Sequence, residues 1–88
     1  MELKDTIELM ISDNYMARFQ AEYLQTKIRY EKLHRLLVKH DAGTLNFTPS
    51  CSIEFLRHQA STMGQYLYDL EVRAEIENIK LDNLLIPG

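Results

Sequence analysis

Two long segments of the chain repeat mostly apolar residues at alternating intervals of three and four positions. In the first segment, the repeat runs through Phe19, Tyr23, Thr26, Tyr30, Leu33, Leu37 and His40. In the second segment, it runs through Ile53, Leu56, Ala60, Met63, Leu67, Leu70 and Ala74. Residues at this spacing lie on one face of an α-helix turn after turn. The pattern therefore predicts an all-α fold, an antiparallel hairpin of two long helices.

Residues that cap or break helices set the expected limits of these elements. Ser12, Asp13 or Asn14 can cap the first long helix, and Gly43 is a suitable stop after it. Cys51 or Ser52 can cap the second. We expect a single domain, 1–88, with a short N-terminal helix at 1–11, a long helix at 13–41, a loop at 43–51, a long helix at 52–79 and an apolar tail at 80–88.

The loop between the long helices contains Leu45 and Phe47, which alternate with polar residues. Pro49 follows them and the run is short, so a strand is not favoured. We expect a turn in which Leu45 and Phe47 act as apolar anchors.

A chain of 88 residues that forms one hairpin buries little apolar surface. Further apolar residues lie outside the two stripes: Leu24, Ile28, Leu36, Phe55, Ile76 and Ile79. Covering these side chains requires the N-terminal helix, a second subunit or both. We therefore expect a symmetric homo-oligomer in the form of a helical bundle.

Composition narrows the cellular setting and the partners. The formal net charge is −3, which does not favour nucleic acid as a partner. Cys51 is the only cysteine, which excludes an intramolecular disulfide and fits a reducing compartment. No apolar run has the length of a membrane span, and the acidic start lacks the basic region of a signal peptide. We expect a cytoplasmic protein.

A basic block at 27–40 lies next to the loop and suggests an anion site. We expect Arg29, Lys32 and Arg35 to hold phosphates near Arg57, while a tyrosine at the groove between the helices stacks on a base. The full candidate set is Arg18, Tyr23, Gln25, Arg29, Tyr30, Lys32, Arg35, Arg57, Gln59 and Tyr66. The alternative is that the tyrosines are core residues with hydroxyls bonded to carboxylates, and that the basic block is a solvated face.

Catalytic groups do not converge in the sequence. His34, His40 and His58 lack the HExxH spacing of a zinc helix, and the chain has neither a glycine-rich phosphate loop nor a nucleophile elbow. We therefore expect a protein that is not an enzyme and that has no metal or cofactor.

Several short stretches resemble a family of short proteins from crAss-like phages and from phages and prophages of Firmicutes. The resemblance rests on Asp5-Thr6-Ile7-Glu8-Leu9-Met10, Tyr15, Arg18-Phe19, Ala21-Glu22-Tyr23, Gln25, Lys27 to Leu33, Asp41-Ala42-Gly43, Phe47, Pro49, Cys51, Leu56, Gln59, Tyr66-Leu67, Leu70-Glu71 and Arg73-Ala74. It covers residues 1 to about 81, and the tail at 82–88 departs from the family pattern. The resemblance implies a viral accessory protein and no particular activity.

Two functions fit a small viral protein without catalytic groups. The first is counter-defence by sequestration of a nucleotide-derived immune signal, of the ADP-ribose type or a cyclic nucleotide. The alternative is a helical protein-interaction module that occludes a host or phage protein.

Overall fold

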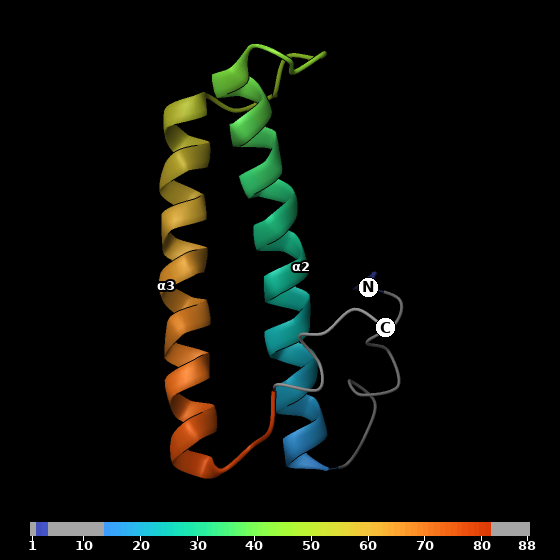
Figure 1. Ribbon diagram of the computed structural model, residues 1–88, viewed down its shortest axis with the longest axis vertical. Helices are drawn as coiled ribbons and strands as arrows, with labels where there is room; N and C mark the ends of the chain where they lie inside the picture. Colours follow the sequence, from blue (N-terminus) through green and yellow to red (C-terminus); the bar gives the residue numbers. More distant parts are fainter. Residues whose placement is uncertain (1, 4–13, 82–88) are drawn as a thin grey trace.

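The computed structural model describes residues 2–3 and 14–81, and a helical hairpin lies within 14–81. Helix α2 (Tyr15–Ala42) and helix α3 (Ile53–Glu77) run side by side in opposite directions (Figure 1). This confirms the all-α antiparallel hairpin. The N-terminal helix expected at 1–11, apart from residues 2 and 3, and the tail from 82 onward lie outside the described residues. Neither described helix is long and apolar enough to cross a membrane.

Each long helix begins at a polar side chain that caps it. The Asn14 side-chain oxygen accepts a hydrogen bond of 2.8 Å from the backbone N–H of Met16. At α3, the Ser52 hydroxyl oxygen accepts one of 3.2 Å from the backbone N–H of Phe55. These bonds satisfy N–H groups that have no partner within the helix. Of the candidates in the sequence, Asn14 and Ser52 are therefore the caps.

Both helices end at a residue in the left-handed backbone conformation. Gly43 ends α2 with φ of 77°, and Asn78 ends α3 with φ of 58°. Glycine adopts this conformation at little cost, and asparagine tolerates it better than most residues. The backbone N–H of Ile79 then donates to the carbonyl of Ala74 at 2.8 Å, which turns the chain away from the helix axis.

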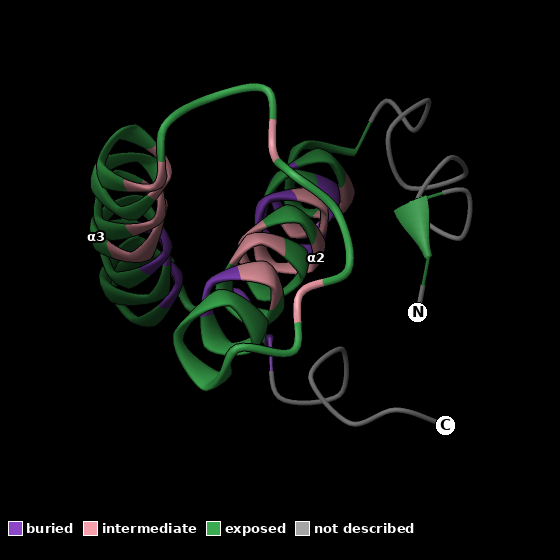
Figure 2. Ribbon diagram, turned by 90° about the horizontal axis from the view of Figure 1, so that it is seen from above, coloured by how far each residue is buried: buried purple, intermediate pink, exposed green. Residues whose placement is uncertain are grey.

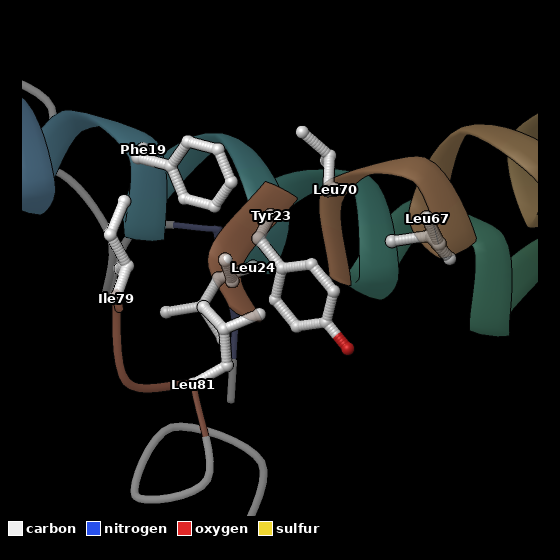
Figure 3. Close-up of a cluster of buried hydrophobic side chains, with 8 residues drawn as sticks. Phe19, Tyr23, Leu24, Leu67, Leu70, Ile79 and Leu81 are labelled. Atoms are coloured by element: carbon white, nitrogen blue, oxygen red, sulfur yellow. The ribbon is translucent and has the colours of Figure 1, made fainter. Parts of the chain in front are cut away.

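The core lies at the end of the hairpin that is remote from the loop. The segment after α3 turns back toward α2, and Ile79 and Leu81 on it pack against the helices (Figures 1 and 3). The buried cluster consists of Phe19, Tyr23, Leu24, Leu67, Leu70, Ala74, Ile79 and Leu81. Near the loop no third segment among the described residues covers the helices, so Leu56 is only half-buried and His40, which belongs to the apolar stripe, is exposed.

The loop runs along the side of α2 that faces away from α3 before it crosses to α3 (Figure 2). Leu45 is half-buried, but Phe47 is 55% exposed. The expectation that Phe47 anchors the loop is therefore wrong, because this ring borders open hollows instead of the core.

Candidate functional site

Tyr23 lies in the core and its hydroxyl is already engaged. The side chain is 1% exposed and lies among the buried apolar residues (Figure 3). Its hydroxyl donates a hydrogen bond of 2.7 Å to Oε2 of Glu71. Burial and this hydrogen bond raise the pKa of Tyr23 above its ordinary value of 10.0. The arrangement corresponds to the core alternative for this residue, and its ring faces are not open to a ligand.

The other two candidate tyrosines also contact neighbouring side chains. Tyr66 is exposed, and its hydroxyl donates to Oε1 of Glu22 at 3.1 Å across the interhelical groove. The half-buried Tyr30 stacks on His34 with ring centroids 6.0 Å apart, and its ring edge lies over Gly64. The groove between the helices therefore contains tyrosines that link α2 to α3 or pack against it.

Arg57 is neutralised by a partner on α2. Its guanidinium bonds the carboxylate of Asp41, and this bond holds the pKa of Asp41 below its usual range. The pair joins the last turn of α2 to the first turns of α3 across the loop. A phosphate at Arg57 would have to compete with this carboxylate.

Lys32 and Arg35 lie together in a hollow of about 280 Å³ between α2 and the loop. Lys39 lies in the same hollow, because residues 32, 35 and 39 share one helical face. The complete lining is Lys32, Arg35, Leu36, Lys39, Thr44, Leu45, Asn46 and Phe47. We call it the basic hollow. It lies outside the interhelical groove where we expected the site.

The cations of the basic hollow are little neutralised. Lys32 approaches Glu2 at 3.5 Å, and both side chains are largely exposed. Within the described part of the chain, neither Arg35 nor Lys39 forms an ion pair through its side chain. Positive charges without counter-charges, set in a concave surface, attract an anion. This is the strongest anion-binding feature among the described residues.

The remaining candidates do not gather at this hollow. Three of them lie on α2, closer to its N-terminus than the hollow: Arg18 and Arg29, which are exposed, and Gln25, which is half-buried. Gln59 lies exposed on α3. The structure thus brings Lys32 and Arg35 together, and it gives Tyr23, Tyr66 and Arg57 partners elsewhere.

Sequence reasoning missed two residues of the basic hollow, Lys39 on α2 and Phe47 on the loop. Lys39 belonged to the basic block but was not chosen, although its spacing from Lys32 and Arg35 places it on their helical face. Phe47 gave no such signal, because a short loop carries no periodicity that indicates which side of a helix it follows.

A further hollow of about 370 Å³ lies at the opposite end of the hairpin. Glu71 and Glu75 line it together with residues 78–81. Two carboxylates disfavour a phosphate there, and Lys80 is the single lining residue of positive charge. This hollow is therefore a poor anion site.

Comparison with known proteins gives one family. The model of the Sequestin family matches residues 13–76, a range that includes all of α2, the loop and nearly all of α3. The match also includes the complete lining of the basic hollow. No curated protein and no solved structure matches the chain. Because the matched range is well over half of the sequence, the chain belongs to the Sequestin family.

Proposed function

We propose that this protein is a phage counter-defence protein that binds and sequesters a nucleotide-derived immune signal without catalysis. The ligand is of the ADP-ribose type or is a cyclic nucleotide. The observation that carries the proposal is the basic hollow, where Arg35 and Lys39, which form no ion pair with any described residue, adjoin an exposed aromatic ring. The family name, Sequestin, fits a protein that acts by sequestration.

The chemistry of the basic hollow suits a nucleotide in two respects. Arg35 can donate two parallel hydrogen bonds to one phosphate, while Lys32 and Lys39 act as point charges. Phe47 presents an apolar face on which a base can stack, and stacking of this kind typically contributes about 1–3 kcal/mol per base. A ligand that covers Phe47 would also remove its ring from water.

The same lining supports binding without turnover. The described residues that line the basic hollow include no carboxylate, imidazole or thiol, and Glu2, whose carboxylate approaches Lys32, is not part of the lining. Thr44 supplies a hydroxyl, but no neighbouring base is present in the lining to activate it. A ligand held there keeps its bonds intact, and its removal from solution is the biological effect.

Calorimetry against ADP-ribose, cyclic ADP-ribose and a cyclic dinucleotide tests the proposal. We expect Arg35→Ala or Lys39→Ala to weaken binding of the preferred ligand by roughly ten- to a hundredfold, because each removes a charge-assisted contact to phosphate. Higher salt should weaken binding as well. Lys80→Ala is the matched control, because it removes the same charge at the other end of the hairpin and should leave the affinity nearly unchanged.

Three results would count against this site or this function. Equal losses in Lys39→Ala and Lys80→Ala would indicate diffuse charge attraction. A loss of affinity in Arg29→Ala without a loss of affinity in Lys39→Ala would place the site in the interhelical groove. If no ligand of the panel binds to the unaltered protein, sequestration of a nucleotide is excluded and the alternative function takes its place.

The alternative is a helical protein-interaction module that occludes a host or phage protein. One observation favours it, an apolar row of Tyr68, Val72 and Ile76 on the outer face of α3. These residues are one helical turn apart and are exposed, so they can receive another helix. Native mass spectrometry of protein purified from defence-active cells separates the two functions, since a bound nucleotide and a stoichiometric polypeptide differ greatly in mass.

A further inference from the structure

Another, larger hollow lies beside the basic hollow. It has a volume of about 620 Å³ and lies between the end of α2, the loop and the start of α3. Leu45 and Phe47 line both hollows, so the two are neighbours along the loop. The complete lining is His40, Gly43, Leu45, Phe47, Thr48, Pro49, Ser50, Cys51, Ser52 and Ile53. We call it the neutral hollow.

The two hollows differ in charge. The neutral hollow is lined by no lysine, arginine, aspartate or glutamate, whereas three cations line the basic hollow. Its lining includes Thr48 and Ser50, which carry hydroxyl groups, and the apolar Leu45 and Phe47. Hydroxyl groups beside apolar surface suit an uncharged polar group such as a sugar, and they offer no counter-charge to a phosphate.

We infer that the neutral hollow is a second subsite for the same ligand, which holds an uncharged sugar linked to the phosphates in the basic hollow. This inference rests on the proposed function. At about 280 Å³, the basic hollow alone is small for a complete nucleotide conjugate, because ligand pockets usually measure about 300–1,000 Å³. With the neutral hollow beside it, a phosphate ester that carries a second sugar can place its phosphates in the basic hollow and that sugar in the neutral hollow. The ring of Phe47 lies at the boundary, where the base can cover it.

The test compares ADP with ADP-ribose, which carries a terminal ribose on the second phosphate and therefore one negative charge fewer near pH 7. The charge difference favours ADP in the basic hollow, so a preference for ADP-ribose reports the contribution of the ribose. We expect the unaltered protein to bind ADP-ribose roughly tenfold or more tightly than ADP, because only ADP-ribose fills both hollows. Ser50→Leu places a bulky side chain in the neutral hollow and should abolish most of this preference. Thr48→Leu tests the same space from another position, in case the first variant disturbs the loop. Ser61→Leu, an identical change on the exposed face of α3, should keep the preference.

Circular dichroism establishes that each variant is folded before its affinities are compared. Equal affinity of the unaltered protein for ADP and ADP-ribose would overturn the inference while leaving the proposed function intact. Losses of the same size for both ligands in Ser50→Leu and Thr48→Leu would do the same. If neither ligand binds to the unaltered protein, and the rest of the panel also fails to bind, the proposed function falls and this inference falls with it.

Discussion

Tyr23 joins the two helices through both parts of its side chain. The ring fills the core beside Leu70, and the hydroxyl donates a hydrogen bond to Oε2 of Glu71 on α3. Loss of that proton would place a phenolate against a carboxylate, with little water to separate the charges. One residue thus makes the packing of the hairpin sensitive to alkaline pH.

We predict that the free energy of unfolding falls above pH 10 because of Tyr23. Its pKa is raised in the folded state, so its contribution is complete below the ordinary value of 10.0 and is lost as the pH rises toward the folded value. Urea denaturation at a series of pH values measures the slope. Tyr23→Phe should show a smaller fall over the same range, and equal slopes in the two proteins would contradict the assignment.

The contrast between Arg57 and Lys39 shows what the sequence reveals of a site. Both residues belong to the positive end of the hairpin, which could be recognised from the basic block alone. Arg57 is neutralised by Asp41, 16 positions away in the sequence, whereas Lys39 forms no ion pair with any described residue. Such pairing depends on the angle at which two helices meet, and a single sequence does not give that angle.

At the scale of the helices, the two glycines at 43 and 64 have opposite roles. Gly43 adopts a φ of 77°, and an added Cβ there would meet no atom within 4 Å. Any cost of a side chain at this position is therefore backbone strain. Gly64 lies within α3, and an added Cβ would come 3.4 Å from Cε1 of Tyr30, which is an ordinary contact.

We predict opposite signs for two identical substitutions. Gly43→Ala should lower the free energy of unfolding by about 1–2 kcal/mol, the cost of a left-handed conformation for a residue with a Cβ. Gly64→Ala should raise it by up to about 1 kcal/mol, because alanine favours the helix interior more than glycine does. Urea denaturation followed by circular dichroism measures both. Destabilisation by Gly64→Ala would mean that Tyr30 cannot accommodate the added methyl group.

The helices were predictable because helix formation depends on residues that are close together in the sequence. The 3-4 spacing of residues such as Phe19, Tyr23, Leu67 and Leu70 identified both helices and the face on which they meet. The position of the core was not predictable, since Leu81 lies beyond the end of α3 and enters the core only because the chain turns at Asn78. The path of the loop was not predictable either. For that reason, the side of α2 that forms the basic hollow could not be predicted.

At the scale of the whole molecule, the outer face of α3 remains uncovered by described residues. Ile76 is 78% exposed and Tyr68 is 61% exposed, with Val72 between them. A row of this kind on a small protein is typical of an interface. A second copy of the chain is the simplest occupant, in keeping with the homo-oligomer expected from the sequence.

We predict a dimer or a higher symmetric oligomer that uses this row. Light scattering at micromolar concentration should show the oligomer, and Ile76→Glu should shift it toward the monomer because a charge would be buried at the interface. Val38→Glu, a similar change at an exposed apolar residue of α2, should have no such effect. A stable monomer of the unaltered protein would rule out the prediction.

The buried cluster lies at one end of the hairpin, and the basic hollow and the neutral hollow lie at the other, which affects how such a protein can change over time. Residues of the cluster cannot be replaced freely, because each contributes to a small core and proteins have little stability to lose. The residues of the loop carry almost none of that core, so most replacements there leave the fold intact. Under the proposed function, a virus facing a host with a modified signal could therefore alter ligand preference through the loop alone, by single steps, without first acquiring compensating substitutions in the helices.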